Sequence, residues 1–343
     1  MSGSRPVQEA TMNGSGRGTA ARGGSASLLQ TLLLLRQQTA LVIALALFCT
    51  FAVVVPATFL TPDNLANVAR QVSLDAPLVI GQMLVLIAGG IDISVGSTMA
   101  AATAIAIGLQ PYGTGTAVVA ALLFGACVGA FNGLLVTRGR IVPFVATLGT
   151  MSVVRGGLLT YTGQQPLSGV DDAFHVWGGG SLGIVPVPLV LALVIVVVLS
   201  VVLDRTRLGR DLYAVGGNRE SAFAAGIPVA RTLFAAFVMS GTLAAFSGVL
   251  VASRLNAATV QLGHDTALLS ISAALIGGGS LLGGRGSVMG AFIGVLALGM
   301  LTNGMNLIGV HTHWQIAAKA LILIGVVVFD SLMRSVSSRS KTS

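Results

Sequence analysis

The sequence predicts an all-α, polytopic membrane protein with about ten transmembrane helices, some of them short or broken, and with both termini in the cytoplasm. The composition is 54% hydrophobic and 9% charged, with a mean hydropathy of +0.90, which is not the surface of a soluble protein. Long apolar runs recur along the chain, and the basic residues gather in alternate loops. The net charge of +8 is scattered instead of forming a stripe, so we expect a lipid bilayer as the environment and no nucleic-acid partner.

Three regions follow from the composition along the chain. Residues 1–38 are predicted to be a disordered cytoplasmic tail, because roughly residues 1–27 are rich in Gly, Ser, Thr, Ala and Arg and hold almost no large apolar residues to bury. Residues 39–332 are predicted to be the transmembrane domain, and residues 333–343 a cytoplasmic C-terminal tail. The first apolar run is long enough to span the bilayer and begins too far from the start for a signal peptide, so we expect it to remain in the mature protein.

The predicted spans are apolar runs of about 15 to 21 residues, which approach or reach the length of a membrane-crossing helix. The two shortest runs are compatible with broken or re-entrant segments. The ten runs are 40–60, 76–90, 96–110, 116–136, 142–161, 186–203, 233–253, 267–282, 288–304 and 314–330.

The orientation follows from the basic residues between these runs. With ten spans, nearly all of the loop arginines fall on one side, which the positive-inside rule makes cytoplasmic. They precede the first span, follow the fourth and the sixth, and end the chain: Arg5, Arg17, Arg22, Arg36, Arg138, Arg140, Arg205, Arg207, Arg210, Arg219, Arg231, Arg334 and Arg339. The opposite side holds Arg70, Arg254 and all four histidines.

A polar, glycine-rich stretch, AGGIDISVGS at residues 88–97, follows directly on an apolar run. Its candidate site residues are Gly89, Gly90, Asp92, Ser94 and Gly96. Glycines let a helix unwind and offer backbone groups to a solute, or let helices pack closely. Packing is the more general reading of any single glycine, but it leaves the carboxylate and the hydroxyls unexplained. We therefore interpret the segment as a helix break on a translocation pathway.

Asp92 calls for a partner, because a carboxylate in hydrocarbon costs on the order of 3 kcal/mol on insertion scales. We expect it to order the break by hydrogen bonding to nearby hydroxyl and amide groups. Two alternatives stay open: a cap that accepts amide hydrogens near Ser94 or Val95 at a cytoplasmic turn, and a charge-carrying role.

The motif has an echo later in the chain. Residues 275–287 read LIGGGSLLGGRGS and resemble LIAGGIDISVGS at residues 86–97 in their apolar lead-in, glycine cluster and terminal Gly-Ser. Two such breaks suggest a duplicated design. Gly278 and Gly279 are therefore candidates for the second break.

The longest basic loop, near residues 204–232, holds a predicted short surface helix. Asn218 is a good N-cap, Gly226 suits a C-terminal cap, and Pro228 prevents continuation. So short a helix needs support from the ends of spans or from a partner protein. An ordinary amphipathic connector is the alternative.

Four amides within or directly beside the predicted spans are candidates for lining a pathway for an uncharged polar solute: Gln82, Asn132, Asn303 and Asn306. The alternative for each is a hydrogen bond between helices, worth roughly 0.6 to 2 kcal/mol. The chain lacks the glycine, four residues, Gly-Lys-Ser/Thr pattern of a P-loop, the H-E-x-x-H and G-x-S-x-G motifs, and paired carboxylates at helical spacing in a span. We therefore expect no enzyme activity, no catalytic residue, no metal site and no cofactor on this chain.

Three stretches together resemble the permease subunit of bacterial ATP-binding-cassette importers for monosaccharides, the ribose, xylose, arabinose and galactose group, over roughly residues 40–332. They are AGGIDISVGS, AVGGNRESAFAAGI at residues 214–227, and GGGSLLGGRGSVMGAFIGVLALGMLTNGMNLIGV at residues 277–310. The resemblance implies that the cytoplasmic loop is a coupling helix that docks on the ATPase. The family's Glu-Ala-Ala, three residues, Gly pattern falls on Glu220, Ser221, Ala222 and Gly226, with Ser221 departing from the expected Ala. Asn218 and Arg219 begin the same helix.

The resemblance also implies the partners and the place in the cell. It implies a separate cytoplasmic ATPase that holds the ATP and Mg, a periplasmic sugar-binding protein, a second copy of this chain, and the bacterial inner membrane. The alternative function is an ion-coupled secondary transporter of a small polar solute, which needs embedded carboxylates or histidines. The candidates for that role are Asp92, and Asp75 and Asp330 at span ends.

Overall fold

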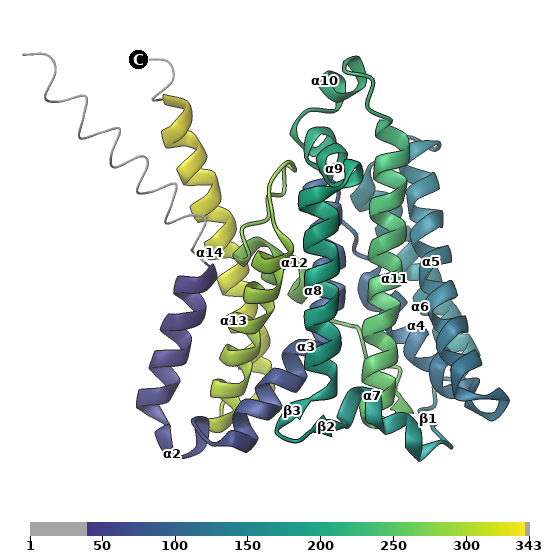
Figure 1. Cartoon of the computed structure of the whole chain (residues 1–343), viewed down its shortest axis with the longest axis vertical. Coiled ribbons are helices and arrows are strands. Elements are labelled where there is room, and N and C mark those ends of the chain that lie inside the picture. The colour runs from purple at the N-terminus through teal and green to yellow at the C-terminus, as the bar shows by residue number, and fades with distance from the viewer. Residues whose placement is uncertain (1–39, 340–343) are drawn as a thin grey trace, which may run out of the picture. The chain divides into compact units, whose positions relative to one another are not determined.

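The computed structural model describes residues 40–339, and helices make up most of this part of the chain (Figure 1). The all-α prediction is therefore confirmed for the described residues, and the predicted tail at residues 1–38 lies outside them. A helix at Ala40–Val54 comes first. The longer helices that follow are α3 (Pro62–Ile87), α4 (Val95–Gly108), α5 (Thr114–Thr137), α6 (Pro143–Thr162), α8 (Val187–Arg205), α9 (Arg207–Gly217), α11 (Val229–Leu255), α12 (Thr266–Ile276), α13 (Val288–Leu307) and α14 (Thr312–Arg339).

Short elements connect these helices. They are α2 (Pro56–Phe59), η1 (Gln110–Tyr112), η2 (Asp172–His175), α7 (Val176–Gly179) and α10 (Arg219–Ala224), with four two-residue strands β1 (Leu167–Ser168), β2 (Ser181–Leu182), β3 (Val185–Pro186) and β4 (Ala257–Ala258). The strands pair antiparallel as β1 with β4 and β2 with β3. Figure 1 shows α9 and α10 at one end of the helices and α7, β2 and β3 at the other.

Five helices are long and apolar enough to cross a membrane by length and composition: α3, α5, α8, α11 and α13. Ala40–Val54, α4 and α12 are shorter apolar helices, with α4 spanning 14 residues and α12 spanning 11. The protein is therefore a multi-pass membrane protein, and its short helices agree with the expectation that some spans are short or broken.

The prediction for the second span was wrong in its start. Helix α3 is 26 residues long and begins at Pro62, where the Thr61 hydroxyl accepts a hydrogen bond from the Asn64 amide at 3.3 Å. Asp63, Arg70 and Asp75 lower the hydropathy of its first half, so the apolar run alone located only the second half. Asp75, predicted at a span end, consequently lies near the middle of α3.

Helices α3 and α11 lie at the centre of the packing. Helix α11 contacts α3, α4 and α5, and α3 also contacts α8, α12 and α13. The α5–α11 contact uses small residues, since a Cβ on Gly125 or Gly241 would lie 2.4 Å or 2.2 Å from the backbone oxygen of the other. Close packing is thus the role of these glycines, as the general rule for membrane helices predicts.

Helix α14 runs past residue 332, the predicted end of the transmembrane domain. It continues to Arg339, so the described part of the predicted C-terminal tail, residues 333–339, is helical. The polar residues after Leu332 end the apolar run without ending the helix, because Ser and Arg are tolerated in a helix.

Candidate functional site

The two glycine-rich breaks end their helices in the same way. After α3, the Gly89 amide donates to the Leu86 carbonyl and the Gly90 amide donates to the Val85 carbonyl, both at 2.9 Å, with Gly89 at φ +77°. After α12, Gly278 and Gly279 donate to Leu275 and Ala274 at 3.0 and 2.9 Å, with Gly278 at φ +87°. This is the Schellman cap in both places, which requires a left-handed residue that glycine supplies without strain.

Asp92 lies in the loop between α3 and α4 and is 1% exposed. Its Oδ1 accepts hydrogen bonds from the Ser94 amide at 3.0 Å and the Ser94 hydroxyl at 2.6 Å. Its Oδ2 accepts one from the Ser240 hydroxyl of α11 at 3.0 Å. The carboxylate thus holds the loop closed on itself and ties it to α11, which is the arrangement expected of an ordering role.

Further hydrogen bonds extend this network to α5 and α6. The Asn132 Nδ2 donates to the Ser94 hydroxyl oxygen at 2.8 Å, and the Ile93 amide donates to the Thr147 hydroxyl oxygen at 3.1 Å. The Ser97 hydroxyl donates to the Ser94 carbonyl at 2.9 Å. Asn132, predicted on the pathway, is therefore part of the network that fixes the break.

The short helix α10 has the caps that the sequence predicts. The Asn218 Oδ1 accepts from the Ser221 amide at 2.8 Å at the start of α10. At its end, the Ile227 amide donates to Ala222 at 3.0 Å and the Gly226 amide donates to Phe223 at 2.9 Å, with Gly226 at φ +77°. Ala222 is buried and Phe223 is 76% exposed, so α10 presents one aromatic side chain outward.

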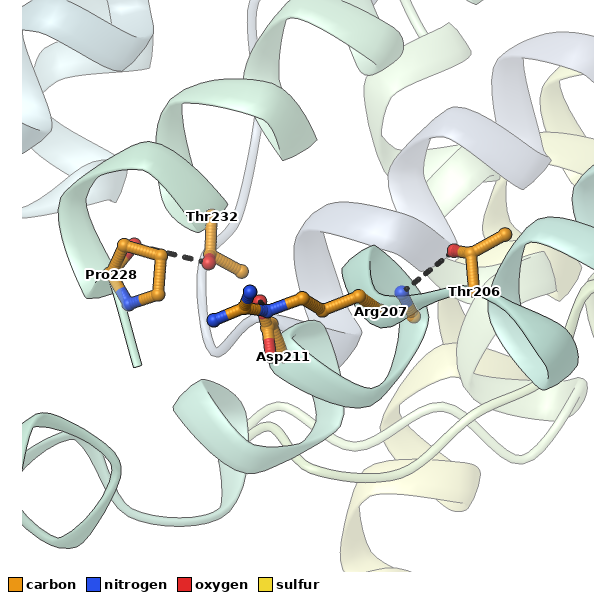
Figure 2. Close-up of polar contacts among 6 residues, drawn as sticks. Thr206, Arg207, Asp211, Pro228 and Thr232 are labelled. Atoms are coloured by element: carbon orange, nitrogen blue, oxygen red, sulfur yellow. Dashed lines mark hydrogen bonds and ion pairs between the residues drawn. The ribbon is translucent and has the colours of Figure 1, made fainter. Parts of the chain in front are cut away.

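A second helix in the same loop, α9, was missed by the sequence analysis. Figure 2 shows Thr206 at its start, where the hydroxyl oxygen accepts from the Gly209 amide at 3.4 Å, and the exposed Arg207 near Asp211 at 3.8 Å. The same view shows Thr232 bound to the Pro228 carbonyl at the start of α11. The available signal was the threonine N-cap followed by Leu208, Leu212 and Val215 at helical spacing. Of these leucine and valine residues, Leu212 and Val215 are buried.

The C-terminal end of α9 meets both glycine-rich breaks at one point, which we call the glycine junction: Gly89, Gly216, Gly283 and Gly284. A Cβ on Gly216 would lie 1.7 Å from the Ile87 carbonyl oxygen and 2.6 Å from the Gly284 nitrogen. A Cβ on Gly283 would lie 2.7 Å from the Gly89 Cα. The Gly284 amide donates to the Ile87 carbonyl at 2.8 Å. Three backbone segments are thus in direct contact, with no room for side chains between them.

Two side chains from the α9–α10 loop region reinforce the glycine junction. The Arg219 Nη2 donates to the Gly89 carbonyl at 3.0 Å, and the Tyr213 hydroxyl donates to the Gly286 carbonyl at 2.9 Å. Burial raises the pKa of Tyr213, and the nearby Asp204 carboxylate raises it further. The hydroxyl therefore keeps its proton at neutral pH and remains a hydrogen-bond donor.

The remaining candidates have varied surroundings. Asn303 exchanges hydrogen bonds with Asn64 at 2.8 and 3.0 Å, and the Asn306 Oδ1 accepts from Gln315 at 2.6 Å. Gln82 is fully buried, and within residues 40–339 neither atom of its amide has a protein partner. An added Cβ on Gly96 would lie 2.3 Å from the Gly263 carbonyl oxygen, so Gly96 permits close packing.

A cavity of about 580 Å³ lies beside α10. It is lined by Val136, Thr137, Arg219, Phe223, Ile227, Pro228, Val229, Ala230, Arg231 and Leu233. Its apolar walls and two arginines offer a partner protein both a hydrophobic contact and positive charge. No group of three metal-ligating side chains occurs among the described residues.

Sequence reasoning found the two breaks and α10 but missed the residues that connect them. Gly216, Gly283 and Gly284 stand in the quoted motifs, yet nothing local distinguishes them from other glycines of the chain. Ser240 and Tyr213 were missed because their partners, Asp92 and Gly286, lie 148 and 73 residues away along the chain.

Comparison with known proteins places most of the chain in one family. Residues 64–329 match the family described as "Branched-chain amino acid transport system / permease component". The chain is 36% identical over 277 residues to the ribose import permease protein of Bacillus subtilis (strain 168), covering 80% of this chain and 86% of the relative.

Two further relatives carry other sugars in their names. The D-allose transport system permease protein of Escherichia coli (strain K12) is 33% identical over 283 residues, which cover 81% of this chain and 86% of the relative. The L-arabinose ABC transporter permease protein of Azospirillum brasilense is 34% identical over 305 residues, which cover 88% of this chain and 89% of the relative. No solved structure was found to match the chain.

Proposed function

Because this chain belongs to the family of branched-chain amino acid transport system permease components, we propose that it is the transmembrane permease subunit of an ATP-binding-cassette importer that carries a monosaccharide, a ribose-like pentose or a hexose, into the cytoplasm. Its relatives named for ribose, allose and arabinose support a sugar as the solute over a branched-chain amino acid. The single observation that carries the mechanism is the glycine junction.

The glycine junction gives the cytoplasmic loop a direct mechanical route to the membrane. Helix α10 is capped at both ends and bears the exposed Phe223, so a partner protein can bind it as a rigid unit. Its first residue, Arg219, holds the end of α3 through the Gly89 carbonyl, and α9 touches both breaks through Gly216. Since backbones in contact move together, displacement of α10 shifts the end of α3 and the glycine-rich loop that follows α12.

The proposal assigns the energy source and the partners to other chains. The sequence lacks a P-loop, so ATP and Mg are held by a separate cytoplasmic ATPase, and this chain is not an enzyme. A periplasmic sugar-binding protein delivers the sugar, and two copies of this chain form the pore in the inner membrane. Ten spans with both termini in the cytoplasm are the proposed topology.

The surroundings of Asp92 bear on the ion-coupled alternative. Both carboxylate oxygens accept hydrogen bonds from Ser94 or Ser240, so the group serves a structural network instead of facing an open ion path. An ion-coupled transporter needs an embedded group that is free to bind and release its ion. This observation favours the ATP-driven importer.

Uptake measurements test the proposed function. Cells that express the chain with its ATPase and binding protein are given labelled ribose, allose or arabinose. We expect uptake of at least one sugar that survives a protonophore but is lost when the P-loop lysine of the ATPase is replaced. Uptake that persists without the ATPase lysine, or that stops with the protonophore alone, contradicts the proposal and supports the secondary transporter.

A further inference from the structure

Helix α3 carries four polar side chains on one face, which we call the α3 stripe: Asn64, Gln71, Asp75 and Gln82. Their spacing of 7, 4 and 7 residues returns to nearly the same direction on a helix with 3.6 residues per turn. The stripe extends about 27 Å along the helix axis, close to the roughly 30 Å hydrocarbon thickness of a bilayer. A polar face of that length is costly in a membrane unless it faces protein or water.

The side chains opposite the stripe are also polar. Asn64 is bonded to Asn303 of α13, and a cavity of about 70 Å³ opens beside the stripe's middle. This cavity is lined by Gln71, Asp75, Leu269, Val295, Leu298, Gly299, Thr302 and Lys319. It therefore brings an amide, a carboxylate, a hydroxyl and an ammonium group together between apolar walls.

The polar and charged side chains around this cavity are connected by hydrogen bonds and electrostatic attraction, and they remain partly exposed in the single chain. The Gln71 Nε2 donates to the Asp75 Oδ2 at 3.1 Å, and Arg254 Nη1 donates to the Gln71 Oε1 at 3.0 Å. The Lys319 ammonium attracts the Asp75 carboxylate. In the single chain Gln71 is exposed, and Asp75, Thr302 and Lys319 are half-buried. A half-buried carboxylate near the middle of α3, with an ammonium group across the cavity, faces water or another protein chain instead of lipid.

Toward its cytoplasmic end, the stripe continues to Gln82. This amide is fully buried, and neither of its polar atoms has a partner within residues 40–339. Buried amides are almost always paired with protein or water, so an unpaired one in a polar row marks a place for a water molecule or a solute hydroxyl.

We propose that the α3 stripe, with Thr302 and Lys319, forms one wall of a water-filled path through the membrane and hydrogen-bonds the hydroxyl groups of an uncharged, polyhydroxylated solute in transit. The inference rests on the proposed function for the identity of that solute. Carboxylate, amide and ammonium groups suit hydroxyls, because together they accept and donate strong hydrogen bonds. A cavity of about 70 Å³ is far below the several hundred Å³ of a ligand pocket, so in this conformation it has room for water and the path must widen for the solute to pass.

Thiol accessibility tests the water-filled path independently of the sugar. In a full-length chain carrying Cys49→Ser and Cys127→Ser, assembled with its partners in membrane vesicles, Thr302→Cys is treated with a charged, water-soluble methanethiosulfonate. Val197→Cys is the matched control, because Val197 lies near the middle of α8 and is 62% exposed among valines. We expect Thr302→Cys to react at least about tenfold faster, since the reagent needs water and an ionised thiol. Equal rates at the two positions overturn the path.

Sugar selection tests the contact with the solute. Asp75→Asn preserves the shape of the side chain and removes its charge, and Asp63→Asn makes the same change at the exposed start of α3. We expect Asp75→Asn to change the ratio of ribose, allose and arabinose uptake at least about threefold at equal membrane abundance, as a lost charged hydrogen bond would. If Asp75→Asn leaves the sugar uptake ratio unchanged, as Asp63→Asn is expected to do, the proposed contact between Asp75 and the solute is overturned. If the parent imports none of the three sugars, the proposed function fails while the thiol measurement still decides the path.

Discussion

At the scale of single residues, Asp92 acts through the groups that it holds. Its three hydrogen bonds close the loop after α3 and join it to α11, while Asn132 adds α5 to the same network. A buried carboxylate with three donors organises its surroundings without needing to change its charge. The break beside it is thereby kept in one conformation.

Substitutions at Asp92 separate this ordering role from a charge-carrying one. We expect Asp92→Asn to retain much of the uptake, because an amide can still bond Ser94 and Ser240. Asp92→Leu should abolish uptake at comparable membrane abundance, since it leaves these buried hydroxyls without their acceptor at about 1 to 3 kcal/mol each. If Asn is as inactive as Leu, or if transport acidifies the interior stoichiometrically, Asp92 carries charge.

Gly216 and Gly217 form a matched pair for testing the glycine junction. A Cβ on Gly216 would lie 1.7 Å from the Ile87 carbonyl oxygen, whereas a Cβ on Gly217 meets nothing within 4 Å. Gly216→Ala should therefore force the backbones apart at a cost of roughly 1 to 3 kcal/mol, lowering both thermal stability in detergent and sugar uptake. Gly217→Ala should leave both unchanged. Equal behaviour of the two variants in the thermal melt and the uptake assay would remove the glycine junction from the mechanism.

The residue scale is also where the sequence was least predictive. The motif around Asp92 identified its local partner Ser94, because a carboxylate commonly bonds groups two residues away. It did not identify Ser240, and the glycine junction depends on contacts between residues 87–89, 216 and 283–284. Such long-range contacts arise from the packing of whole helices, which local patterns do not encode.

At the scale of elements, each of the ten predicted runs overlaps a helix of the described chain, because hydropathy is a strong signal for membrane helices. Boundaries were predicted well where caps are local, as at Asn218 and Gly226 of α10. They failed in α3, whose polar stripe hides half of the helix from a hydropathy window. Helix α9 was missed because it is amphipathic and not uniformly apolar.

The exit from α10 offers a test of the coupling helix. Gly226 is left-handed at φ +77°, a conformation that costs a residue with a side chain roughly 1 kcal/mol and a β-branched residue more. Gly226→Val should misdirect α10, so that the chain is inserted and abundant but fails to retain the ATPase or to couple hydrolysis to uptake. Gly226→Asn is the control, because asparagine tolerates this conformation. Wild-type copurification of the ATPase and wild-type uptake from Gly226→Val and from Glu220→Lys would make the loop a mere connector.

At the scale of the whole molecule, a single copy does not enclose the proposed path. The cavity beside the α3 stripe is bordered by the exposed Gln71, and Asp75, Thr302 and Lys319 are only half-buried in one chain. Charged groups within membrane helices are not left facing lipid, so we expect a second protein surface to cover them. A second copy related by two-fold symmetry would place the same polar wall opposite, because such an interface uses one surface patch twice.

The functional pore is therefore predicted to be a homodimer. Mass measurement of the complex extracted in mild detergent should give two copies of this chain, and two differently tagged copies should purify together. The charged surface also predicts that Asp75→Leu combined with Lys319→Leu does not prevent pairing, because apolar side chains of similar size can replace charged groups that become buried at an interface. Its expected effect is on uptake alone. One copy of this chain paired with a different permease would contradict the homodimer. In that case the α3 stripe would have to face the different permease instead of a second copy of this chain.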